Sequence, residues 1–352
     1  MKKAVLLITL ALSSAMVFAQ KVDKNELKQL KTFLSQPAEK DATNAQALKI
    51  TDLNAPSTWE GVTVENGRIT EIKWKDKKLA GDLNLSGFTA LRTVDVSRNK
   101  LASLSVDGDV SLTELNASRN AMTSVDFGNC AALEKVSLNN NRLLEMDLSG
   151  ATAIKNLNVS NNYFVDLNVS GITSLQTLNC QGNHLENLKV DGCTGLKNLY
   201  AGYNKLTTLN LFGVENLQNL NVDDNQLTTM IVSGLPSLST FVCTDNNMVT
   251  LGVRNCNNLL DLVCSYNDLT TLDVSGCTNL LFVDCSYNDL TRLNLSNQTY
   301  LQRLLCNNNQ LQMLDVSFDS ALTYINCRYN VLTDIRTIGC SNLRMMACQW
   351  NP

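Results

Sequence analysis

From residue 91 onwards, apolar and polar residues follow a pattern that repeats every 21 positions. Each unit reads L-x-x-L-x-L/C-x-x-N, and further apolar residues come two and five positions after the asparagine, as at Leu269 and Leu272. A fixed period of this length is typical of a repeat architecture. The asparagines keep this phase thirteen times, as Asn99, Asn120, Asn141, Asn162, Asn183, Asn204, Asn225, Asn246, Asn267, Asn288, Asn309, Asn330 and Asn351.

The spacing predicts the shape of one unit. Apolar residues three and then two positions apart place a short strand on one face of a coil, and the asparagine can satisfy backbone groups of the turn after that strand. One unit supplies no core of its own, so neighbouring units must stack. Because 21 residues leave no room for a full returning helix, we expect a solenoid with a parallel β-sheet on its concave face. Short extended or 3₁₀ segments should form its convex face.

With this motif, residues 91–352 resemble a leucine-rich-repeat protein of the short bacterial class. They are similar to the cysteine-bearing internalin-type proteins and related secreted or surface repeat proteins. The resemblance covers about three-quarters of the chain. It implies a solenoid that binds proteins or other macromolecules with its concave sheet, and it fixes no particular ligand.

Residues 20–90 are expected to cap the first turn of the solenoid. Apolar residues at helical spacing predict a short amphipathic helix that ends at Pro37, and a second short helix is possible within 42–50. The pair Asn66-Gly67 between two β-prone runs signals a hairpin. The apolar residues of the predicted helix are Leu27, Leu30, Phe33 and Leu34.

The segment after the hairpin imitates one repeat. Ile69, Ile72, Trp74 and Leu79 take the apolar positions, and Lys77 stands in place of the asparagine, 22 residues before Asn99. Trp74, like Trp59 earlier in the chain, is interpreted as part of the cap rather than as a ligand-binding residue.

The first nineteen residues read as a secretory signal. They combine the basic pair Lys2-Lys3, an apolar stretch over residues 4–12 and the small-residue exit Val17-Phe18-Ala19. Cleavage near Ala19 would deliver the chain to the periplasm, the cell surface or the medium. It would also lower the count of basic residues from 29 to 27 against 33 acidic ones, and the formal charge from -4 to -6. That balance argues against nucleic acid as a partner, and no later stretch is apolar enough to span a membrane.

All twelve cysteines fall at two positions of the repeat. Seven lie three residues before the asparagine and five lie ten residues after it, at sites that elsewhere carry small or apolar residues such as Val96, Ala117, Ala151 and Val214. Buried thiols that act as small hydrophobes fit this pattern. In-register strands aim their Cβ atoms the same way, so we expect a reduced ladder rather than disulfides. The cysteines are Cys180, Cys243, Cys264, Cys285, Cys306, Cys327 and Cys348 at the first position, and Cys130, Cys193, Cys256, Cys277 and Cys340 at the second.

The chain offers no convergent set of catalytic groups. The only histidine, His184, has no obvious cysteine or serine partner and is interpreted as a solvated turn residue. Thiolates in one straight row cannot surround a tetrahedral zinc ion. Calcium is the alternative for the acidic rim, but it lacks a D-x-D-x-D-G loop, so we expect no enzyme activity, no metal and no cofactor. The acidic residues of the rim are Asp223, Asp224, Asp245, Asp268 and Asp289.

The outward-facing strand positions change character along the array. Early units carry polar residues such as Asn116 and Asn158, whereas later units carry apolar and aromatic ones. Contiguous exposed apolar surface marks an interaction site, and Tyr and Trp are enriched among residues that dominate binding energy. For Tyr266 and Tyr287, stacking between repeats is the favoured alternative. The candidate ligand-binding residues are Val263, Tyr266, Phe282, Tyr287, Leu305, Tyr324, Tyr329 and Trp350.

The leading hypothesis is a non-catalytic module that binds a protein or a glycan through the C-terminal half of the concave face. A second hypothesis comes from the last unit, which stops one residue after Asn351. Leu343, Met346 and Cys348 would then face outward from an open end, where an unpaired strand edge invites pairing. A structural protein that forms a homodimer through this end is therefore the alternative.

Overall fold

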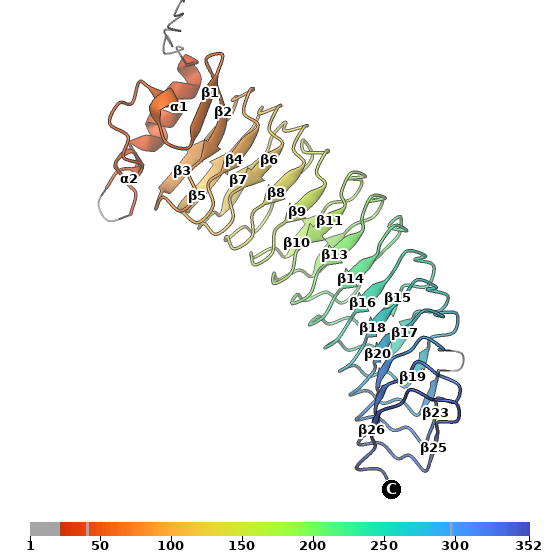
Figure 1. Ribbon diagram of the computed structural model, residues 1–352. Coiled ribbons are helices and arrows are strands. Elements are labelled where there is room, and N and C mark those ends of the chain that lie inside the picture. The colour runs from red at the N-terminus through yellow and green to blue at the C-terminus, as the bar shows by residue number, and fades with distance from the viewer. Residues whose placement is uncertain (1–21, 40–41, 296–297) are drawn as a thin grey trace, which may run out of the picture.

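The computed structural model describes residues 22–39, 42–295 and 298–352. The expected secretory signal lies outside the described residues. The chain forms a curved rod in which one turn of the solenoid stacks on the next, with two helices at its N-terminal end (Figure 1). This is the predicted architecture, and it is a parallel β-solenoid.

The N-terminal end is covered by a helix and a hairpin. Helix α1 (Lys24–Leu34) begins at Asp23, whose side chain accepts hydrogen bonds from the backbone N–H groups of Asn25 and Glu26. The second helix, α2 (Asn44–Ala47), has only four residues and is shorter than the sequence suggested. The 3₁₀ segment η1 (Pro56–Thr58) leads into the hairpin of β1 (Val62–Glu65) and β2 (Arg68–Lys73), which confirms the hairpin signal.

Two aromatic residues tie this cap to the solenoid. Trp74 is fully buried, stacks on Phe33 with ring centroids 6.0 Å apart, and donates its indole N–H to the carbonyl of Glu60. Trp59 is also buried and donates to the carbonyl of Asp52. Both tryptophans therefore belong to the core of the cap, as expected.

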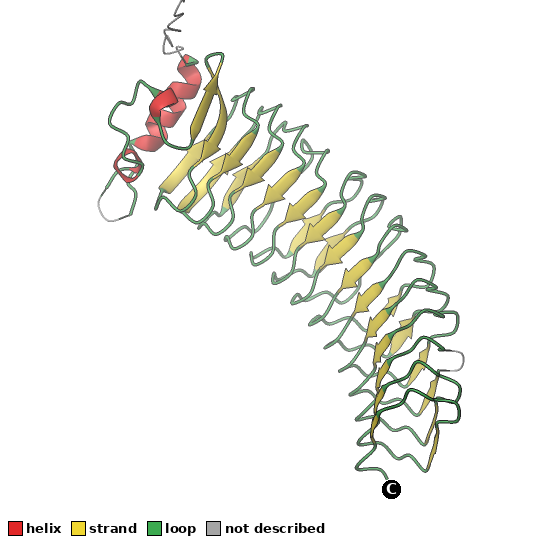
Figure 2. Cartoon of the chain, viewed as in Figure 1, coloured by secondary structure: helices red, strands yellow, loops and turns green. Residues whose placement is uncertain are grey.

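One long sheet runs through the whole molecule and forms the concave face. Its strands are parallel and in register, except for the antiparallel pair at the start, and Figure 2 shows them aligned along the rod. After β1 and β2 the strands follow in the order β4 (Thr93–Asp95), β6 (Glu114–Asn116), β8 (Lys135–Ser137), β9 (Asn156–Asn158), β11 (Thr177–Asn179), β13 (Asn198–Tyr200), β14 (Asn219–Asn221), β16 (Thr240–Val242), β18 (Asp261–Val263), β20 (Phe282–Asp284), β22 (Arg303–Leu305), β24 (Tyr324–Asn326) and β26 (Met345–Ala347).

The segments that connect one concave strand to the next are extended. Extended and 3₁₀ segments were both expected here. The connecting segments pair into small parallel sheets on the convex face. Within the described part of the array, from residue 91 onwards, none of them is a 3₁₀ helix. The strands are β3 (Ala80–Asn84), β5 (Lys100–Ser105), β7 (Ser124–Asp126), β10 (Asp166–Asn168), β12 (Asn187–Lys189), β15 (Thr229–Ile231), β17 (Thr250–Gly252), β19 (Thr271–Asp273), β21 (Arg292–Asn294), β23 (Met313–Asp315) and β25 (Asp334–Arg336).

The repeated asparagine joins each turn to the one before it. The Asn225 side-chain oxygen accepts from the backbone N–H of Leu206 at 2.9 Å. Its amide donates to the carbonyls of Ala201 and Val222 at 3.0 and 3.1 Å. The same set recurs at the other asparagines, from Asn99 to Asn351. Each asparagine therefore satisfies backbone groups of two turns at once, which extends the predicted role.

Strand side chains that point inward form one continuous core. The first two apolar positions of the motif, such as Leu217 and Leu220, are almost fully buried in every turn before the last one. No helix among the described residues is long and apolar enough to cross a membrane.

Candidate binding face

Two columns of side chains project from the strands of the long sheet toward the concave side. The in-register pairing places Asp261, Phe282, Arg303, Tyr324 and Met345 in the first column, one on each successive strand. The second column holds Val263, Asp284, Leu305, Asn326 and Ala347 in the same order. Strands β20, β22 and β24 therefore carry the sequence-predicted residues Phe282, Leu305 and Tyr324 on adjacent positions.

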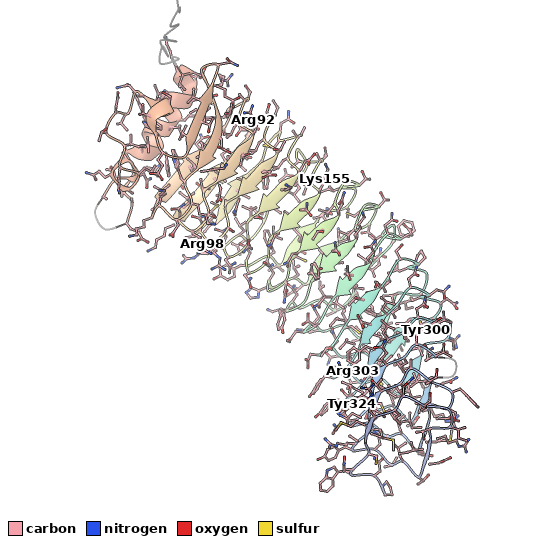
Figure 3. The ribbon with its side chains drawn as sticks, viewed as in Figure 1. Arg92, Arg98, Lys155, Tyr300, Arg303 and Tyr324 are labelled. Carbon is pink, nitrogen blue, oxygen red and sulfur yellow. The ribbon has the colours of Figure 1, made fainter. Side chains whose placement is uncertain are left out.

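The centre of the first column is an arginine between two aromatic rings. The guanidinium carbon of Arg303 lies 5.1 Å from the ring centroid of Phe282 and 6.0 Å from that of Tyr324. Both rings are half-buried, whereas Arg303 is exposed. Figure 3 shows Arg303 and Tyr324 next to each other near the C-terminal end of the sheet. Such cation–π contacts hold the guanidinium in place and stabilise it by about 0.5–1 kcal/mol at an exposed site.

The apolar residues do not form the unbroken surface that the sequence suggests. Asp284 lies between Val263 and Leu305 in the second column, and Arg303 separates Phe282 from Tyr324 in the first. The Asp284 carboxylate turns back to its own strand end, where it accepts from the N–H and the hydroxyl of Ser286 at 3.0 and 2.6 Å. The face is therefore a mixed one, with a cation among apolar and aromatic groups.

The N-terminal half of the concave face is different because its polar groups are paired with each other. In the first column Lys135 contacts Glu114 at 2.5 Å, and further along Asn219 donates to Asn198 at 2.7 Å. At the edge of the sheet Lys155 contacts Glu134 at 2.7 Å. Arg92 and Lys155 lie along one edge and Arg98 along the other (Figure 3).

Aromatic side chains line the edge of the sheet on which Arg98 lies, at the residue just before each repeated asparagine. The rings of Tyr266 and Tyr287 stack with centroids 4.2 Å apart, and those of Tyr329 and Trp350 with centroids 5.7 Å apart. All four stay exposed, Trp350 to 70%. Their backbones are left-handed, with φ between 52° and 65°. Tyr266 and Tyr287 therefore stack between neighbouring repeats, as the alternative to ligand binding predicted. Both aromatic pairs lie beside the two columns of the concave face.

The matches to known proteins agree with this geometry. The leucine-rich-repeat family model matches residues 216–238. No curated protein matches the sequence. Among solved structures, a leucine-rich-repeat protein of Leptospira interrogans is 21% identical, with a TM-score of 0.64 over 78% of this chain and 79% of that one. An internalin of Listeria monocytogenes is 20% identical, with a TM-score of 0.61 over 86% and 92% of the two chains.

A third solved structure is the functional domain of another Listeria monocytogenes protein, described as including a cysteine ladder. It is 24% identical, with a TM-score of 0.50 over 73% of this chain and 70% of that one. The fold is that of leucine-rich-repeat proteins. Leucine-rich repeats are typical of non-catalytic protein-binding modules, and these neighbours are bacterial.

Within this leucine-rich-repeat solenoid, the cysteines lie inside the turns. All twelve are free, ten are buried, and Cys340 and Cys348 in the last turns are half-buried. Burial raises the pKa of Cys180 to about 12 and that of Cys327 to about 11. The five cysteines of the second position each donate to a carbonyl 24 residues earlier, as Cys130 does to Val106 at 2.9 Å. Their burial leaves these thiols little access to a reacting partner, which is typical of structural cysteines.

The second cysteine position does not carry only small or apolar residues, so that part of the sequence interpretation is wrong. Three other turns place Asp109, Gln298 and Asp319 there, and all three are buried. One carboxylate oxygen of Asp109 accepts from the N–H of Phe88 at 2.7 Å, while the other oxygen has no partner. Burial raises the pKa of Asp109 to about 8 and that of Asp319 to about 7.

Other candidate chemistry finds no support in the described residues. They contain no group of three or more metal-ligating side chains. His184 is exposed, and its ring stacks on that of Tyr163 with centroids 5.9 Å apart. It is therefore a surface residue of its turn. Burial is the main cause that raises the pKa of Asp223 and of Asp245, with a smaller contribution from the Asp224 charge.

Arg303 is the residue that the sequence reasoning missed. Phe282 and Tyr324 stand out in the sequence as aromatic residues at outward positions, whereas the arginine midway between them does not. The signal was present in the 21-residue period, because the three residues occupy the same position in consecutive units.

Proposed function

We propose that this chain is an exported, non-catalytic binding module that holds a protein or a glycan on the concave face of strands β18 to β24. The observation that supports this most strongly is the column of Phe282, Arg303 and Tyr324. Its aromatic and cationic groups are held on adjacent strands of a continuous sheet. Side chains fixed on strands lose little freedom when a partner binds, which favours affinity.

The proposed site extends to the neighbouring apolar and rim residues. Val263 and Leu305 add half-buried apolar area next to the column. Tyr266 and Tyr287, together with Tyr329 and Trp350, add exposed rings at the rim. Aromatic residues and arginine are enriched at the energetic centres of interfaces. We place the centre of the site at the column and its periphery at the rim.

Affinity capture from host and bacterial extracts tests the proposal, with the wild-type chain and a Phe282→Ser/Tyr324→Ser variant as baits. A Lys135→Gln variant serves as the control, because Lys135 occupies the same column in the polar half. We expect the serine variant to remain folded, as shown by circular dichroism, and to lose the captured ligand. Retention of the same ligand by this variant would place the site elsewhere.

Self-association through the last turn is the second proposal. Met346 in β26 is 38% exposed, whereas Ile325 at the same position of the preceding turn is fully buried. Burying such surface against a second copy would stabilise a dimer. Sedimentation at several concentrations tests this, and a monomer at all of them would exclude the dimer.

A further inference from the structure

We propose that Arg303 recognises a single carboxylate on a protein partner, and that the partner presents this Asp or Glu side chain among apolar residues. The inference rests on the proposed function, because it names the partner chemistry of the same face. Its basis is the electrostatic situation of Arg303, which differs from that of the other basic residue in its column.

Arg303 is a cation without a partner charge. Among the residues that the structure describes, its guanidinium has no hydrogen bond to a protein group and no carboxylate within ion-pair distance. Lys135, the only other basic residue in the column, is paired with Glu114 of the neighbouring turn. A guanidinium has five N–H donors in a planar fork, which matches the two oxygens of a carboxylate.

The two aromatic rings define how the fork is presented. Phe282 and Tyr324 lie on the two neighbouring strands, on either side of Arg303, so they flank the guanidinium along the solenoid axis. This arrangement limits the freedom that Arg303 would lose on binding, and it removes water from part of its surface. A charge-assisted hydrogen bond is stronger in such partly desolvated surroundings.

The nearest acidic residue in the neighbouring column does not compete for this position. The Asp284 carboxylate is adjacent to Leu305 on the next strand, but the N–H and hydroxyl of Ser286 engage it. Its hydrogen bonds hold it within its own strand end. The fork of Arg303 is thus left for an acceptor supplied from outside.

The surrounding charges decide between a single carboxylate and a polyanion. Asp261 lies two strands from Arg303, about 10 Å away at the usual strand spacing, and Asp284 lies on the neighbouring strand. The whole chain carries a formal charge of -4. A polyanionic glycan or nucleic acid that ran along the column would meet repulsion from both carboxylates on the N-terminal side of the arginine. One carboxylate flanked by apolar side chains matches the order of Val263, Phe282, Arg303 and Leu305.

Peptide selection tests the inference directly. A phage library of random linear peptides is selected in parallel on the full wild-type chain, on Arg303→Gln and on the matched control Lys135→Gln. We expect the wild type and the control to enrich peptides with one Asp or Glu between aliphatic or aromatic residues. The Arg303→Gln variant should not enrich them.

Calorimetry on a synthetic peptide from this selection then measures the pair. Arg303→Gln should weaken binding roughly 10- to 100-fold, the usual loss for a hydrogen bond to a charged group. Arg303→Lys should fall between the two, because it keeps the charge and loses the fork. Replacing the acidic peptide residue by its amide should weaken binding to the wild type and have little further effect on Arg303→Gln. Equal thermal unfolding midpoints show that the variants are folded.

Three results would overturn the inference. The wild type enriches peptides that lack an acidic residue, it enriches no peptide at all, or it binds a glycan on an array and the Arg303→Gln variant does not. Different results would contradict the proposed function. If binding depends on Phe282 and Tyr324 but not on Arg303, the face stands and only the role of the arginine falls. If binding depends on none of the three, the face itself is wrong.

Discussion

At the scale of single residues, Asp109 is a carboxyl group at a buried position where most other turns place a cysteine or an apolar side chain. Cysteines at this position donate to a carbonyl of the preceding turn. A protonated carboxyl can donate in the same way, whereas an ionised one only accepts. Burial raises its pKa from 3.8 to about 8, so the folded chain favours the protonated form.

This gives a pH dependence with a defined sign. Between the unfolded value of 3.8 and the folded value of about 8, the folded chain holds a proton that the unfolded chain releases. Stability therefore falls as the pH rises through this range. Asp109→Asn, which keeps the acceptor for the N–H of Phe88, should raise the free energy of unfolding at pH 8 by about 1–3 kcal/mol. It should also flatten the dependence, as measured by urea unfolding from pH 5 to pH 9.

The exposed residue Gln226 carries no titratable group and provides the control. Gln226→Ala should leave the slope of stability against pH as it is in the wild type. An unchanged slope in Asp109→Asn would show that the buried carboxyl is not the group that titrates.

Only some of these residues could be selected from the sequence alone. The period located Phe282 and Tyr324 because they break a polar column, but it gave no reason to select Arg303, whose interest comes from the distances to its two neighbours. Asp109 and Asp319 were also overlooked, because the second cysteine position was interpreted from its cysteines and not from its polar residues.

At the scale of elements, the asparagine is the residue on which each turn depends. Asn225→Ala removes the acceptor for the N–H of Leu206 and the donor to the carbonyls of Ala201 and Val222, all in the interior. We expect a loss of about 2–4 kcal/mol in the free energy of unfolding, measured by urea denaturation. The exposed neighbour Gln226→Ala should change it by less than about 0.5 kcal/mol. Equal effects of the two substitutions would contradict this role of the asparagine.

The buried thiols give a second test at this scale. Because a reagent must reach the thiolate, burial should slow alkylation of the ten buried cysteines in the native chain. Cys340 and Cys348 in the last turns are half-buried and should react first with iodoacetamide, as read by peptide mass spectrometry. Early labelling of Cys264 or Cys285, or disulfides between adjacent turns, would contradict the reduced arrangement.

The elements themselves were predictable because the spacing of the leucines and the asparagine defines both the strand and its turn. The convex segments were not, since 3₁₀ and extended chains of this length share the same apolar pattern. Pairing between neighbouring turns selects the extended form. Helix α2 is shorter than the sequence suggested, and Asn44 at its start is fully buried and bonded to the carbonyls of Phe33 and Ala80.

At the scale of the whole molecule, stacking gives a long face whose two halves differ in chemistry. Polar side chains in the N-terminal half bond to one another. The C-terminal half holds a cation between aromatic rings that forms no ion pair with any described residue. Because both halves share one backbone geometry, the contrast lies entirely in the side chains. The fold could thus be predicted from the sequence, while the centre of the proposed site required the register of the strands.

Site-specific photo-cross-linking tests the central claim most directly. A photoreactive phenylalanine analogue replaces Phe282 on the concave face in one variant and Phe212, which is 76% exposed outside the long sheet, in another. With the captured ligand present, we predict cross-links from position 282 and none from position 212. Cross-links from position 212 alone would contradict recognition by the concave face.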